Sequence, residues 1–251
     1  MIEERIAVDT GAGCTHAHLF RPQQQGRWPG VICLTDVLGL REVFKTMARR
    51  IAAEGYVVLL PHLFHAYGQP PMFEGAADFR EPGTWQRAQE IMRSLPPSSM
   101  RRDGAAYVDT LLAQRSVRGE KAGVVGFCFS GAMALYMAAE RPDRIGAAAS
   151  FHGGELCTDD SSSPHRELPR IRAKLYFAHA QDDAHMPSDA IVRLEGSLQS
   201  WGGAYVSEIY PGARHGWTVR DRPAYSEKDA ERAFDSLRNL FRTTFAQPTA
   251  T

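Results

Sequence analysis

Short apolar runs alternate along this chain with segments of helical length, and this alternation constrains the fold more than any other feature. The runs that read as buried strands are Val31–Thr35, Tyr56–Leu60, Ala122–Phe127, Ala147–Phe151, Leu175–Ala178 and Tyr205–Tyr210. The segments of helical length are Arg41–Glu54, Arg101–Gln114, Ala132–Glu140, Ser188–Trp201 and Ala224–Phe245. Nearly continuous apolar strands that alternate with helices indicate a parallel sheet covered on both faces. The predicted fold class is therefore α/β.

Two regions depart from this alternation. The amino-terminal pieces Ile2–Asp9 and Thr15–Phe20 are predicted to form a hairpin at the edge of the sheet. The segment His65–Ser99 is rich in glycine, proline and aromatic residues, and it contains one predicted helix, Thr84–Ser94. Such an excursion commonly covers the carboxyl ends of the strands, where ligands bind, although a plain connecting loop would look the same. No linker divides the chain, so we predict a single domain over residues 1–251.

Charge and cysteine content narrow the class of protein. The chain carries 29 lysines and arginines against 29 aspartates and glutamates, so neither nucleic acid nor an anionic membrane is expected as a partner. It begins without the apolar core of a secretory signal, and its four cysteines contain no CxxC pair. The uncharged stretch Ala122–Ala139 approaches the length of a membrane span, but its glycines and flanking charges favour a buried strand, turn and helix. We therefore expect a cytoplasmic protein that does not span a membrane.

The hexapeptide Gly-Phe-Cys-Phe-Ser-Gly, which starts at Gly126, contains two possible nucleophiles, Cys128 and Ser130. A nucleophile elbow needs small residues two positions before and after the nucleophile, because its strained turn leaves no room for larger side chains. Cys128 has a glycine at the earlier position, whereas Ser130 would need the cysteine itself to fit there. The preceding strand would end at Phe127 in the first case and at Phe129 in the second. Both points favour Cys128, with a buried, unreactive cysteine as the alternative.

Two later loops supply an acid and a histidine. Asp182 and Asp183 lie shortly after the predicted strand Leu175–Ala178, and His215 lies shortly after Tyr205–Tyr210. In enzymes that carry a nucleophile elbow on an open α/β sheet, the acid and then the histidine follow the nucleophile, each after a later strand. The order and the positions fit, so the chain contains the parts of a nucleophile–histidine–acid triad.

Together these motifs resemble the dienelactone hydrolase family, which has the α/β-hydrolase fold. The resemblance rests on the hexapeptide, on Asp-x-x-Met-Pro at 183–187 and on Gly-Ala-Arg-His-Gly-Trp at 212–217, in this order. Further matches are Asp-Val-Leu-Gly-Leu-Arg at 36–41, Ala-Glu-Gly-Tyr at 53–56 and Phe-His-Gly-Gly at 151–154. The resemblance implies a mostly parallel sheet with helices on both faces. It also implies a carboxylic ester hydrolase that opens a lactone or cleaves a small ester without a cofactor or a metal.

The resemblance also assigns roles to residues. It implies a triad of Cys128 as nucleophile, His215 as general base and Asp183 as the acid that orients the imidazole. Asp183 is chosen over its neighbour because the family places its acid four residues before a proline. The oxyanion hole would consist of the backbone N–H groups of Val37 and Phe129. The acyl-enzyme would then be hydrolysed by water that His215 activates.

Three further residues are expected to contact the substrate, and each has an alternative. Asp36 stands where the family usually has a glutamate that controls the resting thiol; its side chain is shorter, so contact with the thiol is left open. His152 either lines the pocket or is structural, and Trp217 either walls the pocket or packs under its loop. Ser130 stands where the family usually has glycine, and its hydroxyl could cap the following helix.

The expected partner is a small lactone or ester, bound by a monomer or a homodimer. Family substrates are often carboxylates, which favours an arginine in the pocket. The candidates are Arg80, Arg87 and Arg220, and for each the alternative is a solvated surface charge. His62 and His65 lack a third ligand, so no metal is expected, and no glycine-rich phosphate loop points to a nucleotide cofactor. Two other functions fit the same sequence: a general carboxylesterase acting on other esters, and a non-catalytic or redox thiol protein.

Overall fold

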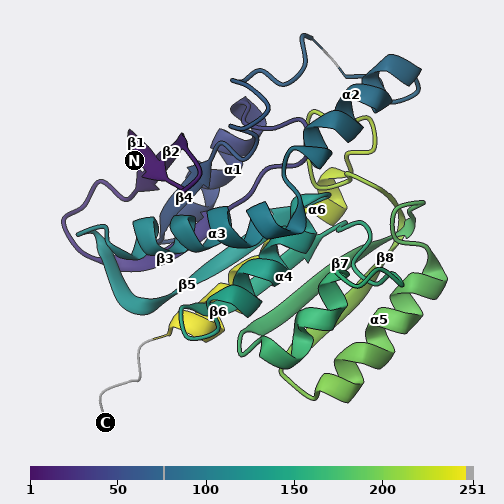
Figure 1. The fold of residues 1–251 in the computed structure, drawn as a ribbon. Coiled ribbons are helices and arrows are strands. Elements are labelled where there is room, and N and C mark those ends of the chain that lie inside the picture. The colour runs from purple at the N-terminus through teal and green to yellow at the C-terminus, as the bar shows by residue number, and fades with distance from the viewer. Residues whose placement is uncertain (76, 247–251) are drawn as a thin grey trace.

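An eight-stranded sheet forms the centre of the computed structural model, which describes residues 1–75 and 77–246 (Figure 1). The strands are β1 (Ile2–Asp9), β2 (Cys14–Arg21), β3 (Trp28–Cys33), β4 (Val57–Pro61), β5 (Val117–Phe127), β6 (Ile145–Phe151), β7 (Lys174–Asp182) and β8 (Tyr205–Arg214). Their order in the sheet is β1-β2-β4-β3-β5-β6-β7-β8. All neighbours from β4 to β8 are parallel, whereas β1 and β2 form an antiparallel hairpin at one edge. The predicted α/β-hydrolase fold with a mostly parallel sheet is confirmed.

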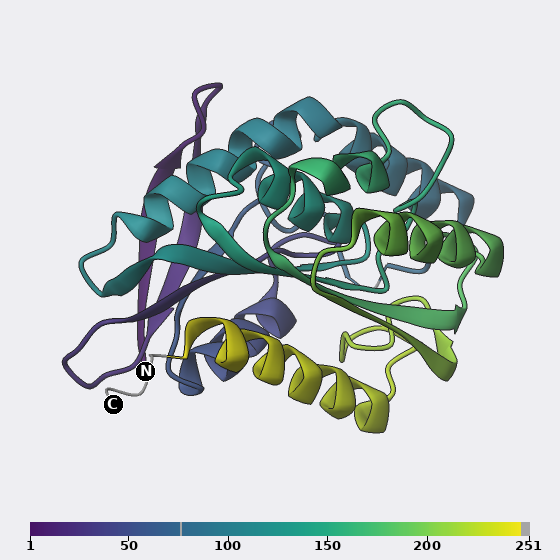
Figure 2. The same cartoon turned by 90° about the horizontal axis from the view of Figure 1, so that it is seen from below.

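Helices cover both faces of this sheet (Figure 2). They are α1 (Glu42–Ala53), α2 (Pro82–Arg93), α3 (Pro97–Leu112), α4 (Ser130–Glu140), α5 (Ser188–Trp201) and α6 (Glu227–Phe245), with a 3₁₀ helix at Pro164–Arg170. The helices α1 and α6 pack on one face, and α3, α4 and α5 pack on the other. In α1 the buried residues Phe44, Ala48 and Ile51 recur at helical spacing, which gives the helix one apolar stripe toward the sheet.

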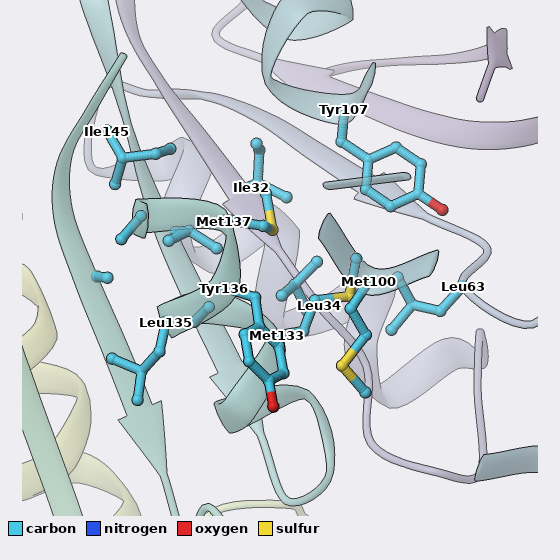
Figure 3. Packing of buried hydrophobic residues seen from close by; sticks show 14 of the residues in the cluster. Ile32, Leu34, Leu63, Met100, Tyr107, Met133, Leu135, Tyr136, Met137 and Ile145 are labelled. Atoms are coloured by element: carbon cyan, nitrogen blue, oxygen red, sulfur yellow. The ribbon is translucent and has the colours of Figure 1, made fainter. Parts of the chain in front are cut away.

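Two apolar cores lie on the two faces, because successive side chains of a strand point in opposite directions. Val31 and Cys33 of β3 enter the core beneath α1 and α6, whereas Ile32 enters the core beneath α4. Figure 3 shows Ile32 among the methionines Met133 and Met137 of α4. Nearly every residue of α4 is buried, and this explains why the helix carries no charge before its last residue, Glu140. None of the described helices is both long and apolar enough to span a membrane.

Three differences from the predicted elements, at the ends of β7 and β8 and at the start of α6, have structural causes. Strands β7 and β8 run to Asp182 and Arg214, four residues beyond the predicted ends, because these two residues pair across a bulge. Helix α6 begins at Glu227 and not at Ala224, because the hydroxyl of Ser226 accepts a hydrogen bond from a backbone N–H in its first turn. A one-dimensional apolar pattern contains neither the bulge nor the exact cap.

Candidate active site

Cys128 lies on a sharp turn between β5 and α4. The strand ends at Phe127 and the helix begins at Ser130, which are the bounds expected if Cys128 is the nucleophile. The backbone φ of Cys128 is 57°, in the left-handed region that residues other than glycine rarely adopt. A Cβ at Gly126 would lie 2.1 Å from the carbonyl oxygen of Ser130, so only glycine fits two positions before the cysteine. This turn has the geometry of a nucleophile elbow centred on Cys128.

The second hydroxyl-bearing residue of the motif, Ser130, is fully buried. Its Oγ accepts a hydrogen bond from the N–H of Phe127 at 2.9 Å and donates one to the carbonyl of the same residue at 3.1 Å. The expectation that this hydroxyl caps α4 is wrong: the N-cap position is Phe129, and no side chain caps it. Ser130 therefore stabilises the turn, because its hydroxyl is hydrogen-bonded to Phe127, the last residue of β5.

Asp183 and His215 meet at the carboxyl ends of β7 and β8. The Nδ1–H of His215 donates to Oδ2 of Asp183 at 2.7 Å, and Oδ1 of the same carboxylate accepts the N–H of His185 at 2.9 Å. Asp183 is 6% exposed, whereas Asp182 lies in solvent. Because a carboxylate can only accept, it holds the imidazole hydrogen on Nδ1 and leaves Nε2 for chemistry. Within residues 1–75 and 77–246, Nε2 has no hydrogen-bond partner.

The charges around His215 favour its protonated form. Burial of the ring opposes protonation, but the Cys128 sulfur and the Asp183 carboxylate outweigh burial and raise the pKa of His215 to about 10. Cys128 also lies at the amino terminus of α4, where free backbone N–H groups favour negative charge. This arrangement suits a thiolate paired with an imidazolium.

Two backbone N–H groups beside the cysteine remain available to a ligand. Val37 follows β3, Phe129 follows Cys128, and both line the same cavity as the thiol. Neither N–H donates to any group in the described part of the chain, whereas the neighbouring Leu38 N–H is taken up by Asp36 at 2.9 Å. Free N–H groups in this position are the donors that a tetrahedral oxyanion requires.

Asp36 binds an arginine and makes no described hydrogen bond to Cys128. Its Oδ1 and Oδ2 accept from the two terminal nitrogens of Arg41 at 2.6 and 2.8 Å. Arg41 also donates to Asp221 at 2.7 and 3.0 Å, and the carboxylates of Asp221 and Asp36 raise its pKa against the opposing effect of burial. Both carboxylate oxygens of Asp36 are thus oriented toward Arg41, and no hydrogen bond between Asp36 and the Cys128 thiol is found among the described residues.

His152 and Trp217 lie beside and beneath the site. His152 lines the cavity, yet both of its ring nitrogens have protein partners, the N–H of Cys128 at 3.1 Å and the Oγ1 of Thr218 at 2.8 Å. Trp217 is 0% exposed and packs against Tyr210 and His152, with ring centroids 5.0 and 5.1 Å apart. This corrects the expectation that Trp217 contacts substrate: its indole lies in the core beneath the loop.

A cavity of about 1080 Å³ opens over the thiol and the imidazole. Part of its wall comes from the excursion His65–Ser99, which contributes Phe79, Trp85, Gln89, Met92, Arg93 and Leu95. Of the arginines and lysines in the described chain, only Arg93 and Arg222 line it. Arg222 is half-buried and stacks on Phe79, 4.7 Å from guanidinium carbon to ring centroid. Arg222 lies seven residues after His215, so proximity in sequence to this histidine is the signal that could have identified it.

The arginines expected to bind a carboxylate lie elsewhere. Arg80 is exposed and pairs with Asp78 at 2.6 Å, and Arg87 donates to the carbonyl of Met72 at 2.7 Å. Arg220 lines a separate cavity between α1 and α6. None of these three candidates lines the cavity over Cys128.

The paired histidines 62 and 65 have structural partners. His62 Nε2 lies 2.8 Å from the carbonyl oxygen of Gly68, and His65 Nε2 lies 3.1 Å from Oδ2 of the buried Asp103. Among the described residues, no group of three or more histidine, cysteine, aspartate or glutamate side chains is arranged to hold a metal ion.

Several known proteins are similar to this chain over nearly its whole length. The "Putative carboxymethylenebutenolidase" of Synechocystis sp. is 27% identical over 235 residues, which cover 90% of each chain. The "Probable 2-oxo-3-(5-oxofuran-2-ylidene)propanoate lactonase" of Bradyrhizobium sp is 28% identical over 245 residues, 94% of each chain. The crystal structure of the "Putative Dienelactone Hydrolase" from Klebsiella pneumoniae has the same fold, with a TM-score of 0.84 at 22% identity, and covers 96% of this chain and 98% of that one.

The family assignment rests on nearly the whole chain. The sequence model of the dienelactone hydrolase family matches residues 15–245, which include the elbow, the acid loop and the histidine loop. The chain therefore belongs to the dienelactone hydrolase family, and it is a carboxylic ester hydrolase.

Proposed function

We propose that this hydrolase opens a lactone, or cleaves a small carboxylic ester, through Cys128, His215 and Asp183 by way of an acyl-enzyme. The observation that carries the proposal is the 2.7 Å hydrogen bond between His215 and Asp183, at a cavity shared with a cysteine on a strained elbow. A nucleophile, a base and a group that orients the base are the parts that acyl transfer needs.

The geometry supports a two-step reaction. The thiolate of Cys128 attacks the carbonyl carbon, and the N–H groups of Val37 and Phe129 stabilise the negative charge on the carbonyl oxygen. The imidazolium of His215 gives its Nε2 proton to the alcohol as the ester bond breaks, which leaves a thioester. His215 then takes a proton from water, which attacks the thioester and releases the acid and the thiolate. In a lactone the alcohol stays tethered, so one ring-opened product results.

The cavity supports a substrate that carries a carboxylate. Arg222 lines this cavity and forms no ion pair within residues 1–75 and 77–246; Asp78 is bound by Arg80, and Arg222 adds only a smaller effect to the lowered pKa of that carboxyl. The recorded hydrogen bond of Arg222 is a long one of 3.5 Å to the carbonyl of Ala77. A half-buried arginine that forms no ion pair within the described residues is suited to bind a carboxylate of the substrate. The name of the Bradyrhizobium relative describes a lactone that bears a propanoate group, in agreement with this proposal. Phe79 and Trp85 would cover the ring of the lactone.

A substrate panel tests the proposed function. Dienelactones, simple lactones and p-nitrophenyl esters are assayed with the wild type and with Cys128→Ala, His215→Ala and Ser130→Ala. We expect hydrolysis that is abolished by the first two substitutions and detectable in the third. Activity that persists in Cys128→Ala but is lost in Ser130→Ala would overturn the assignment of the nucleophile.

The same panel separates the alternatives. Turnover of the p-nitrophenyl esters alone would indicate a general carboxylesterase, and no turnover of any compound would indicate a non-catalytic or redox thiol protein.

The four cysteines are free, which suits a reducing compartment such as the cytoplasm.

A further inference from the structure

We propose that His152 and Thr218 are positioning residues that hold the backbone of Cys128 in its elbow, a role that rests on the proposed function of this cysteine as the nucleophile. The two residues come from different parts of the chain. His152 directly follows β6, and Thr218 lies three residues after His215. Through them the loop that carries the base is linked to the turn that carries the thiol.

The contact to the cysteine is made by its backbone. The N–H of Cys128 is shared between the carbonyl of Phe151 at 3.0 Å and the Nδ1 of His152 at 3.1 Å. The N–H of His152 itself donates to the carbonyl of Ala178 at 2.8 Å, so the histidine is fixed to β7. Cys128 and His152 both have positive φ values, 57° and 41°, and such strained residues persist only where surrounding contacts hold them.

These contacts determine which nitrogen of His152 carries the hydrogen. Because the Cys128 N–H is a donor, Nδ1 must accept and the hydrogen must lie on Nε2. The Nε2–H then donates to the hydroxyl oxygen of Thr218 at 2.8 Å. The Cys128 N–H thus selects the tautomer, and Thr218 stabilises it because its hydroxyl oxygen is the acceptor for the buried Nε2–H. In the other tautomer two N–H donors would face each other at the elbow.

The position of His152 explains why this ring has to stay neutral. It is 1% exposed, and its centroid lies 5.1 Å from that of His215. Burial first, and then the charge of His215, lower the pKa of His152 well below its usual value. A neutral acceptor therefore remains in place when His215 carries its proton, which is the state in which the thiolate attacks.

The hydrogen bonds from His152 to Cys128 and Thr218 matter because the turn at Cys128 positions two groups that the proposed reaction uses. The backbone of Cys128 places its own sulfur, and it also places the N–H of Phe129, which the proposed mechanism uses for the oxyanion. A displacement of about 1 Å in such a site can cost up to roughly 100-fold in rate. Neither His152 nor Thr218 touches the reacting atoms, so they act through the position of the elbow.

The test compares Thr218→Val with Thr218→Ser. Valine keeps the shape of threonine and removes the acceptor, whereas serine keeps the acceptor and removes a methyl group. We expect kcat to fall roughly tenfold in Thr218→Val, with KM within about twofold, and to return to near the wild-type value in Thr218→Ser. The thermal midpoint and circular dichroism of both variants verify that they are folded.

A second readout needs no turnover. The ¹⁵N chemical shifts of the His152 ring should report the Nε2–H tautomer in the wild type and in Thr218→Ser, and a mixture of tautomers in Thr218→Val. The rate at which iodoacetamide alkylates Cys128 should fall in parallel with kcat. These measurements test the link even if the substrate panel shows no hydrolysis, so failure of this inference and failure of the proposed function are distinguishable. Unchanged kcat, or an unchanged tautomer, in a folded Thr218→Val variant would overturn the inference.

Discussion

Gly126→Ala is the smallest change that should disturb the elbow. The added Cβ would lie 2.1 Å from the carbonyl oxygen of Ser130, 2.5 Å from its carbonyl carbon and 2.8 Å from the backbone nitrogen of Gly131. All three contacts are to backbone atoms, so no flexible side chain can move aside. The first turn of α4 would have to shift by about 1 Å to restore ordinary contact distances.

The cost follows from where that turn lies. Helix α4 is buried along nearly its whole length, so it can shift only by disturbing the core. Overpacking of a well-packed core typically costs about 1–3 kcal/mol, and the rigid backbone contacts place Gly126→Ala near the upper value. For a chain of this size, about 3 kcal/mol corresponds to a thermal midpoint roughly 6–12 °C lower. The shift would also displace Cys128, so we expect kcat to fall by up to roughly 100-fold.

The assay is differential scanning calorimetry together with kcat, and the control is Gly196→Ala. Gly196 lies in the exposed part of α5, and no atom stands within 4 Å of its added Cβ. Alanine should stabilise this helix by about 1 kcal/mol, and should raise the midpoint by roughly 2–4 °C without an effect on kcat. If Gly126→Ala melted within 2 °C of the wild type, roughly the effect of 1 kcal/mol, and turned over at the same rate, the argument for a sterically closed elbow would be refuted.

Three further predictions concern the charged groups of the site. In Asp183→Asn the amide can hold His215 in the wrong tautomer, so kcat should fall by roughly 10⁴-fold with little change in the far-ultraviolet circular dichroism. Because Cys128 and Asp183 raise the pKa of His215 from 6.5 to about 10 against burial, the stability from its charge is complete below pH 6.5 and is lost as the pH rises through 10. The free energy of unfolding in urea should therefore differ between the wild type and His215→Gln by an amount that shrinks between these pH values. A difference that stays constant with pH would contradict the raised pKa of His215. Arg222→Met should raise KM roughly tenfold or more for a lactone bearing a carboxylate and leave neutral esters unchanged, while Arg220→Met should change neither.

Much of the fold and part of the site could be predicted from the sequence, because the signals involved are local. Helix α5 has the predicted bounds, Ser188–Trp201, which were assigned as a segment of helical length between two strand-like runs. The choice of Cys128 over Ser130 depended on the length of one strand and on a glycine two positions earlier, and the structure has both. The acid and the histidine lie at the ends of later parallel strands, so the topology alone predicts that they meet.

The sequence by itself determined the parallel sheet, the elbow and the order of Cys128, Asp183 and His215, since these follow from local patterns and from their order along the chain. Only the tertiary structure decided what each polar group binds. Arg41 reaches Asp221 across 180 residues of chain, and His152 reaches Thr218 across 66. Arg222, and not Arg220, faces the cavity over the thiol. Such partners depend on how distant segments pack against each other, and no spacing along the chain encodes that packing.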